Sequence, residues 1–416
     1  MVRVITLLAT LVWSCVAFAQ VDPVRRDLVE GGYDQPISGH APLGTYLFYY
    51  FSRPQFGDAD HAMRIALSPA YLDGEWAIRN AFGAHTDFAV GVSGGGFDSD
   101  YDEIRNGQWI RQESFTGHDG GVEARVYHLF NPGQRIPLNG ILQGGFRYVA
   151  YLRDSHNPPD FVVPADQPTA RIRAGLRFGG IEPLLAPDMA MELSAWYEGD
   201  ARLDAGPYGF GGDRTVQSRV QRFFARGLFV YTLPHSQQRF SAVLQGGSQV
   251  HPDRLSAWRI GGVLPLDAEF PLNVPGYYEG EFSARNFVLV GADYSLPIDA
   301  AQRWRVGVGA ATAHIDYTQG LEEPHSWVTG ASASLGYTPA NKGWKVSLVY
   351  GHGFDAMRHG HRGADSLSLL LEVDLERMGY MKAGREGPPR ATDAPLGAAS
   401  GASVGDNIPT STSQQP

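Results

Sequence analysis

Two motifs carry side chains that could do hydrolytic chemistry. Gly91-Val92-Ser93-Gly94-Gly95 matches the G-x-S-x-G pattern of a nucleophilic serine. Separately, His118-Asp119 could be half of a surface hydrolase site, although no partner serine is identifiable for it. A nucleophile elbow needs a strand, a tight turn and then a helix, whereas a long polar loop begins just after Gly96. We therefore interpret the motif as a strand end, and we predict that the protein is not an enzyme and has no catalytic residues.

A histidine-rich stretch near the carboxyl end has the ligand types of a metal site. His352, His359 and His361 lie close to Asp355 in the sequence, and imidazole and carboxylate are common ligands of zinc. Their spacing matches no established zinc pattern, and the glycines and arginines between them are typical of a solvated loop. We predict neither a metal site nor a cofactor.

The elements that must position these residues are short strands with alternating polarity. In residues 171–178, arginines at 171, 173 and 177 share one face and apolar side chains share the other, because side chains alternate along a strand. A soluble sandwich would bury the apolar face in its core, whereas a membrane barrel would turn it to lipid. The alternation alone fits both folds.

The lengths of the connections distinguish the two folds. Short, proline-containing connections alternate with long ones, as outer-membrane barrels alternate periplasmic turns with outer loops. The short ones are 131–137, 181–186, 233–238, 297–302 and 338–343; the long ones are 98–120, 153–168, 199–217 and 251–276, with shorter versions at 318–326 and 355–364. The sequence therefore predicts an all-β fold, a transmembrane antiparallel β-barrel in the outer membrane of a Gram-negative bacterium.

Fourteen strands account for the alternating stretches. They are expected near 44–53, 61–72, 88–97, 121–130, 138–152, 169–180, 188–198, 218–232, 239–250, 277–296, 303–317, 327–337, 344–354 and 365–375. Two more strands in 73–87 or the longest loops would make 16. We expect four regions: a signal peptide over 1–19, a short periplasmic segment over 20–43, the barrel over 44–377 and a disordered tail over 378–416.

Export is indicated by the amino end. Arg3 precedes an apolar run, and Ala17-Phe18-Ala19 is a typical cleavage site for a secretory signal peptide. Lipidation of Cys15 is the alternative, but bulky Trp13 argues against it. The formal net charge of -10 and the lack of a basic stripe argue against a nucleic-acid partner. Expected partners are outer-membrane lipid and lipopolysaccharide, the barrel assembly machinery during biogenesis, and a periplasmic partner of the carboxyl-terminal tail.

Arginines on predicted inward faces have two interpretations. They would either line an anion-selective pore or brace a filled lumen by pairing with inward acids. The residues concerned are Arg147, Arg171, Arg173, Arg177, Arg222 and Arg226.

Aromatic side chains near strand ends would form the girdles at the two membrane interfaces, with ordinary core packing as the alternative. Examples are Phe48, Tyr50, Trp196, Tyr277, Trp304, Trp327 and Trp344.

One stretch of the chain resembles a known family. Arg259-Ile260-Gly261-Gly262, a loop, and then Gly276-Tyr277 before a long strand are similar to the carboxyl-terminal barrel of the BamA/TamA-type insertase and translocator superfamily, the bacterial surface-antigen barrel. In that family the loop opens with Gly-Gly, carries an Arg-Gly-aromatic motif, folds into the lumen and precedes five strands. The resemblance covers roughly residues 250–375, and here too five predicted strands follow the loop.

The last predicted strand is also similar to that family's final strand, which acts as an assembly signal. Its polar start and alternating apolar end fit this role, with Ser368 where glycine is usual. The residues that carry the signal are Ser366, Leu371, Val373 and Leu375.

Two departures limit what the resemblance implies. Pro275 stands where the family has arginine, so Arg254 or Arg259 would have to anchor the loop by pairing with an acid of the next strand. The acids expected to point inward there are Glu279, Glu281 and Asp293. The segment 21–43 is also too short for periplasmic POTRA modules, so the resemblance implies a short, barrel-only form.

Three functional hypotheses follow from the sequence. The first is a barrel of this superfamily that assembles or translocates outer-membrane proteins or lipids, and it predicts that residues 251–276 plug the lumen. The second is a passive porin or solute channel, which predicts stable single-channel steps in planar bilayers, and a closed, silent barrel would count against it. The third is a surface lipid hydrolase, which predicts a serine and a histidine within hydrogen-bond reach on the outer rim, with Ser93 and His118 as the residues that can be named.

Overall fold

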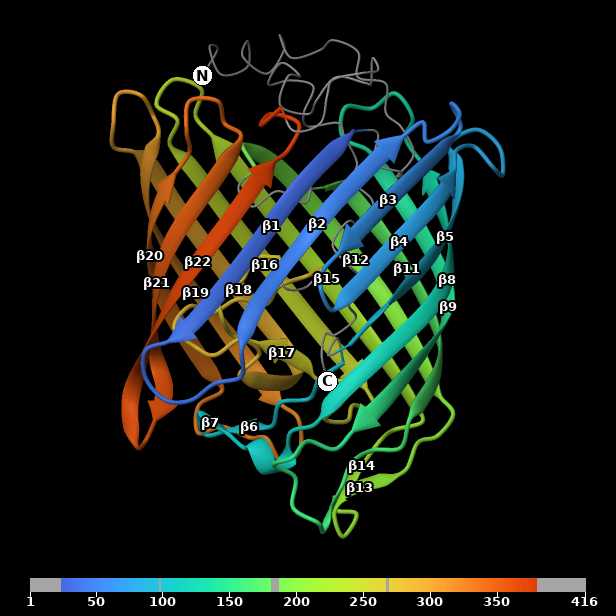
Figure 1. Ribbon diagram of the computed structural model, residues 1–416, viewed down its shortest axis with the longest axis vertical. Helices are drawn as coiled ribbons and strands as arrows, with labels where there is room; N and C mark the ends of the chain where they lie inside the picture. Colours follow the sequence, from blue (N-terminus) through green and yellow to red (C-terminus); the bar gives the residue numbers. More distant parts are fainter. Residues whose placement is uncertain (1–23, 97–98, 181–186, 267–268, 380–416) are drawn as a thin grey trace.

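Antiparallel strands form one closed barrel in the computed structural model, which describes residues 24–96, 99–180, 187–266 and 269–379 (Figure 1). Sixteen strands make the wall. They are β1 (Arg26–Pro36), β2 (Gly44–Pro54), β3 (His61–Leu67), β4 (Tyr71–Ile78), β5 (Thr86–Gly95), β8 (Thr116–Leu129), β9 (Leu138–Leu152), β11 (Gln167–Gly180), β12 (Met189–Arg202), β15 (Arg219–Thr232), β16 (Arg239–Val250), β18 (Phe282–Pro297), β19 (Trp304–Tyr317), β20 (Trp327–Tyr337), β21 (Trp344–Arg358) and β22 (His361–Asp374). The predicted barrel fold is confirmed.

Shorter elements lie in the connections. β6 (Ile104–Arg105), β7 (Gln108–Trp109) and the 3-10 turn η1 (Arg111–Glu113) follow β5. β10 (Phe161–Val162), β13 (Pro207–Phe210) and β14 (Arg214–Thr215) form a small sheet beyond the barrel rim, and β17 (Trp258–Ile260) pairs with β18. In the described residues, no helix is long and apolar enough to span a membrane.

The first and last strands close the barrel. β1 pairs with β22 from Leu28 opposite Asp374 to Pro36 opposite Ser366, and its other edge pairs with β2. β1 lies inside the segment 20–43 that the sequence analysis left outside the barrel, so the barrel begins at Arg26 and not at residue 44. Because β1 pairs with the far end of the chain, no local hairpin pattern marks it.

The predicted strand 61–72 is in fact a hairpin. β3 ends at Leu67, Ser68 donates its N–H to the carbonyl of Tyr71, and β4 returns along β3. Pro69 cannot continue a sheet ladder and marks the turn. With β1 and β4 added, the count rises from 14 to 16. Leu375 lies just beyond β22, and the predicted signal peptide and nearly all of the predicted tail lie outside the described residues.

Loops are sorted by end as predicted. The long connections after β5, β9, β12 and β16 gather at the end where β6, β7 and β13 lie, and the described short turns lie at the other end (Figure 1). The predicted short connection 181–186 lies outside the described residues. The predicted loop 355–364 is wrong, because β21 and β22 continue through it and leave only His359 and Gly360 between them.

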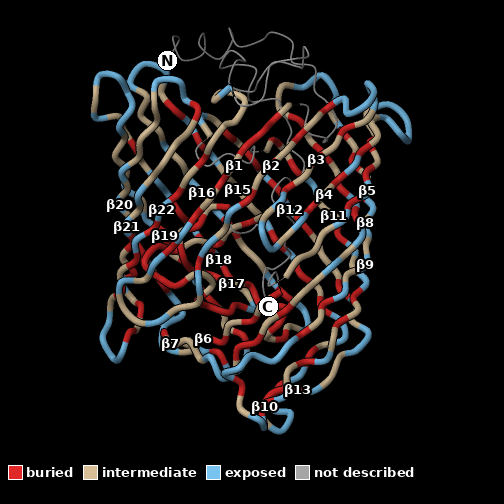
Figure 2. Tube along the Cα trace, in the orientation of Figure 1, coloured by how far each residue is buried: buried red, intermediate tan, exposed pale blue. Residues whose placement is uncertain are grey.

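The two faces of the wall have opposite polarity. Buried and exposed residues alternate along the wall strands (Figure 2). Leu176, Leu193, Leu244 and Val290 are among the exposed apolar residues, whereas many charged residues of the same strands are buried. Trp304 and Trp327 lie exposed at strand ends, as a girdle requires. By contrast Phe48, Tyr50, Trp196 and Tyr277 are buried, so for these four the girdle interpretation is wrong.

Candidate functional site in the barrel lumen

The segment between β16 and β18 leaves the rim and enters the lumen. Asp253 and Ser256 stabilise its first turn, since the Ser256 N–H donates to Asp253 Oδ1 at 2.8 Å and the Ser256 hydroxyl accepts from the Asp253 N–H at 3.0 Å. β17 then lies along β18 with Ile260 opposite Phe282. We call residues 251–281 the lumen loop.

The predicted glycine pair turns the lumen loop inward. Gly261 and Gly262 have φ of 136° and 79°, a backbone conformation that side chains rarely adopt. A Cβ on Gly262 would lie 1.8 Å from Glu279 Oε2, and one on Gly261 would lie 2.4 Å from the Tyr278 carbonyl oxygen. The two ends of the loop can therefore touch only because both residues are glycine.

The middle of the lumen loop crosses from one wall to the other. Leu266 packs with Leu28, Phe48 and Ala66 of β1, β2 and β3. On the opposite wall the Arg173 guanidinium donates two hydrogen bonds to the Glu269 carboxylate, at 2.8 and 2.9 Å. The loop therefore fills the lumen, as the first hypothesis predicted.

An aromatic contact strengthens this crossing. The Phe270 ring lies 4.5 Å from the ring of Phe224 and 5.8 Å from that of Trp196, measured between centroids. Both wall residues point inward from neighbouring strands, β15 and β12. Aromatic pairs stabilise a contact beyond the apolar area that they bury, so the loop is packed against the barrel wall at this point.

The returning part of the lumen loop lies against β20 and β21. Gly276 has φ of 84°, and a Cβ there would lie 2.0 Å from the backbone nitrogen of Gly353. The Tyr277 hydroxyl donates to the Thr329 carbonyl and accepts from the Asp355 N–H, both at 3.2 Å. The predicted Gly276-Tyr277 motif thus docks on the wall through close backbone contact.

The ionic anchor of the loop differs from our prediction. Glu281 accepts hydrogen bonds from Arg358 of β21 at 2.8 and 2.6 Å, and the Arg358 guanidinium lies 3.7 Å from the Tyr278 ring centroid. The hypothesis that Arg254 or Arg259 would anchor the loop on Glu279, Glu281 or Asp293 is therefore wrong. Arg358 anchors the loop instead, and it lies on β21, far from the loop in the sequence.

The other residues of that hypothesis have separate partners. Arg254 pairs with Glu103, and Arg259 donates to the Ser283 hydroxyl at 2.6 Å and to the Asp102 carbonyl at 2.7 Å. Asp293 accepts from the Ser241 hydroxyl at 3.0 Å. Glu279 accepts from the Leu264 N–H at 3.5 Å, inside the loop itself.

Loops close the same end of the barrel around Glu103, which the sequence analysis missed. Its fully buried carboxylate pairs with Arg105, Arg214 and Arg254 from three different connections, and the Tyr101 hydroxyl donates to it. Tyr101, Phe115, Phe161, Tyr208 and Leu255 pack beside it. We call the connection 96–115 and the loops bound to it the cap. No local motif marks Glu103, because its cationic partners are over 100 residues away, save Arg105.

Two carboxyl groups of the cap, those of Asp100 and Glu323, have raised pKa values. Burial raises the pKa of Asp100, whose side chain accepts from the Gly117 N–H at 2.8 Å, to about 7. Burial likewise raises the pKa of Glu323, which accepts from the Asn106 N–H, to about 7. Asn106 belongs to the cap and Glu323 to the connection after β19, so this contact joins the two loops.

Inward arginines brace the lumen. Arg171 donates to Asp200 at 2.7 and 2.9 Å, Arg177 to Glu192 at 3.0 Å, and Arg222 to Asp200 at 3.1 Å. Arg147 pairs with Asp119, and Arg226 lies 5.7 Å from the Phe270 ring centroid. Because these cations have acidic or aromatic neighbours within the lumen, the bracing interpretation fits the geometry and the anion-pore interpretation does not.

The hydrolase candidates and most of the metal candidates lie in ordinary strand positions, and His359 lies in the turn between β21 and β22. Ser93 lies within β5 opposite Gly121, so the strand–turn–helix of a nucleophile elbow is not formed at Gly91–Gly95. His118 lies on β8 opposite Ala150. His352 contacts Asp365 at 2.7 Å, while Asp355 pairs with Arg362.

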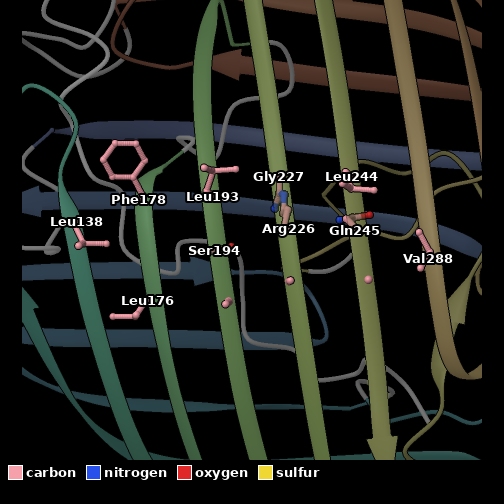
Figure 3. Close-up of a pocket in the computed structure, with 13 residues that line it drawn as sticks. Leu138, Leu176, Phe178, Leu193, Ser194, Arg226, Gly227, Leu244, Gln245 and Val288 are labelled. Carbon is pink, nitrogen blue, oxygen red and sulfur yellow. The ribbon is translucent and has the colours of Figure 1, made fainter.

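Large surface grooves lie outside the lumen. One of about 580 Å³ runs across β11, β12, β15, β16 and β18, and Figure 3 shows Leu176, Leu193, Leu244 and Val288 along it, from β11, β12, β16 and β18. Ala195, Ala225 and Gly227 form its floor. Small residues between larger apolar ones make a shallow groove in the apolar belt, where lipid would lie.

The predicted assembly-signal residues belong to the closing strand. Ser366 is buried and faces Pro36 of β1, whereas Leu371 and Val373 lie opposite Gly31 and Val29. Leu375 donates its N–H to the Asp27 carbonyl at 2.9 Å.

Comparison with known proteins agrees with this architecture. The chain matches no family model and no curated protein. It is similar to the solved structures of CdiB from Acinetobacter baumannii (TM-score 0.53, 10% identity, 84% of this chain and 60% of that chain) and CdiB from Escherichia coli (0.52, 13%, 83% and 62%). It is also similar to BamA from Haemophilus ducreyi lacking POTRA domains 1-3 (0.51, 9%, 83% and 70%). The chain spans less than two thirds of either CdiB chain, and this likeness is one of fold: an outer-membrane type of β-barrel.

Proposed function

We propose that this protein is an integral barrel of the Gram-negative outer membrane that helps to insert or translocate proteins or lipids. The observation that carries the proposal is the lumen loop, which crosses the barrel, docks through Gly276-Tyr277 and is anchored by Glu281 on Arg358. Five wall strands follow it, as the resemblance to the insertase and translocator superfamily implies. The CdiB and BamA barrels are the solved structures whose fold supports this choice.

A filled lumen argues against steady diffusion of solutes. The lumen loop and the cap together place packed side chains and ion pairs across the pathway between the two rims. Steady passage along the lumen would require both to move, whereas an insertase or translocator can keep this passage closed at rest. The protein therefore fits a gated role better than a passive one.

The test is assisted folding in liposomes. We expect liposomes containing the full chain to fold an added, urea-unfolded eight-stranded barrel protein at least fivefold faster than empty liposomes, followed by heat-modifiable migration on gels. A second readout, transfer of a fluorescent phospholipid between leaflets, would reveal lipid as the cargo. Glu281→Gln should reduce whichever activity is found, and Asp213→Asn, on an exposed carboxylate, should not. No effect on either cargo, with steady single-channel steps in planar bilayers, would instead establish a passive channel.

A further inference from the structure

The β3–β4 hairpin stops short of the strands on either side of it. β3 pairs with β2 only from Leu67 opposite Tyr49, whereas β2 continues beside β1 to Gly44 (Figure 1). The stretch Gly44–Phe48, about 17 Å of strand at ~3.4 Å per residue, thus extends past the end of β3. At β3 and β4 the barrel wall is therefore shorter, on the side that faces the long loops, than at β2.

The pairing register shows how deep this step lies. One row of paired residues runs through Trp344, Val373, Val29, Tyr49, Leu67, Leu72, Gly94, Gly120 and Tyr148. It begins at the short-turn end of β21 and finishes near the long-loop end of β9. With strands ~4.8 Å apart and tilted by about 40°, each step climbs about 3 Å, so the row climbs about 25 Å, the height of the apolar belt.

Leu67 and Leu72 are the central members of that row, so the hairpin ends near the middle of the membrane. On the long-loop side of the hairpin tip, the segment that lies beside β8 is the one around Ser99 and Tyr101. The N–H groups of these two residues donate to the carbonyls of Gly117 and Phe115. Because neither β3 nor β4 reaches this level, about three strand spacings, ~14 Å, separate that segment from β2. Among the described residues, the wall therefore has a gap two strands wide in the half of the membrane that faces the long loops.

The backbone of β2 is oriented to bond across this gap. The Ile37 N–H donates to the Asp365 carbonyl, and the Leu375 N–H donates to the Asp27 carbonyl. Odd-numbered residues of β1 therefore bond to β22 and even-numbered residues bond to β2, because the two directions alternate along an antiparallel strand.

This alternation fixes the direction of the β2 groups. Glu30 opposite Phe48 is a bonded pair, so Thr45 and Leu47 direct their N–H and C=O groups away from β1, toward the gap. An open strand edge has no water to bond in hydrocarbon, and acyl chains offer no donors or acceptors. Only another polypeptide strand presents N–H and C=O groups at the matching repeat.

Apolar side chains lie on both faces of the gap, and the hydroxyl of Thr45 beside them donates to the Gly32 carbonyl at 2.9 Å. Leu43, Leu47 and Leu72 are exposed on the outside. On the lumen side, Phe48 packs with Leu266 of the lumen loop. A strand seated here would meet apolar surroundings on both faces, as a strand buried on both sides does.

We propose that the Thr45–Leu47 edge of β2 is a docking site for an extended, apolar segment of polypeptide, which joins the sheet as an added strand. The position and direction of the edge come from the register, while the nature of the guest rests on the proposed function, since insertion or translocation brings unfolded chain to the barrel. The first and last strands stay paired in this arrangement, because the site uses β2 and leaves the β1–β22 contact in place.

Cysteine cross-linking of a defined peptide tests the site. Residues 20–416 contain no cysteine, so Leu47→Cys and Val290→Cys each give one thiol in the chain after the predicted signal peptide. Val290 is a matched control, since it is exposed on the same apolar belt but lies between two paired strands, β16 and β19. The probes are nine-residue peptides of alternating valine and threonine, each with one cysteine at a successive position, added to liposomes holding the full chain. Each peptide cysteine is supplied as its 2-thiopyridyl disulfide, so that attack by the protein thiolate forms the cross-link and releases 2-thiopyridone.

We expect disulfides to form at least tenfold faster at Leu47→Cys than at Val290→Cys, with rates that alternate along the peptide. Thr45→Cys should likewise react faster than Val290→Cys. Adding Leu47→Pro to Thr45→Cys should abolish this difference, because proline removes a donor that faces the gap while leaving the β1 pairing intact. Equal rates at the two sites, or rates without alternation, would mean that lipid fills the gap and would overturn the proposal. The assay needs no folding of a substrate, so it can succeed or fail independently of the proposed function.

Discussion

The carboxylate of Glu281 and the guanidinium of Arg358 form a buried pair joined by two hydrogen bonds, at 2.8 and 2.6 Å. Their side chains are 2% and 3% exposed. Glu281 ends the lumen loop and Arg358 ends β21, so the pair ties the loop to the wall. The Tyr278 N–H also donates to Glu281, at 2.8 Å, and continues the contact into the loop.

Removing the charge of Glu281 should therefore release the loop. Glu281→Gln leaves the Arg358 guanidinium buried without its counter-ion, and breaking such a pair typically costs about 3–5 kcal/mol. We expect a lower temperature for the heat-modifiable gel transition and longer open events in planar bilayers. Arg285→Gln breaks the Arg285–Asp316 pair, whose side chains are 49% and 43% exposed. That control should change stability by less than about 0.5 kcal/mol, and equal effects of the two substitutions would contradict the anchoring role.

The cap should depend on Glu103 in a similar way. Three arginines from separate connections surround this fully buried carboxylate, so Glu103→Gln leaves an excess of buried positive charge. We expect trypsin to cut at Arg105 at least tenfold faster in the variant, measured on the folded protein in detergent. Asp213→Asn is the control, because Asp213 also lies near Arg214 but is 49% exposed. Unchanged cleavage in Glu103→Gln would show that the cap is held by its aromatic cluster alone.

Much of the fold could be predicted because its signals are local. Strand alternation, proline in the short turns and the sorting of loop lengths lie within a few residues of each other. β1 was missed because its pairing with β22 joins residues over 300 positions apart. The β3–β4 turn was missed because Leu67 and Leu72 are both apolar and only Pro69 interrupts the run.

In the candidate site too, the residues of a single segment could be predicted from the sequence, whereas their distant partners could not. Gly261, Gly262 and Gly276 lie in one segment, so the sequence alone allowed them to be compared with a known loop, and all three have positive φ in the structure. The partners of that loop could not be chosen from sequence, since an inward arginine can pair with any acid that the barrel brings near it. Arg358 and Glu103 became identifiable only once the register of the strands was fixed.

Gly276 gives a sharper test of how the loop docks. A methyl group there would lie 2.0 Å from the backbone nitrogen of Gly353, and backbone of a wall strand cannot move aside cheaply. Gly276→Ala should therefore displace the loop and raise conductance as Glu281→Gln does. Gly280→Ala is matched in backbone strain, with φ of 63°, but its nearest neighbour is the Arg259 Cβ at 3.4 Å. If both alanine variants behaved alike, strain rather than the contact with β21 would explain the result.

Asp100 and Glu323 should make the cap sensitive to pH. Burial raises the pKa of each carboxyl to about 7, whereas exposed Asp and Glu have pKa values of about 3.9 and 4.3. Between about pH 4 and 7 the closed cap holds protons that the open form releases, so its stability falls as pH rises through this window. The cap should be tightest below about pH 4 and loosest above about pH 7. Distances between nitroxide labels at Gln108→Cys and Gln319→Cys should therefore broaden from pH 5.5 to pH 8.5. Adding Asp100→Asn and Glu323→Gln keeps both groups neutral, so the distances should stay narrow at both pH values. Equal broadening in that variant would assign the pH response to other groups.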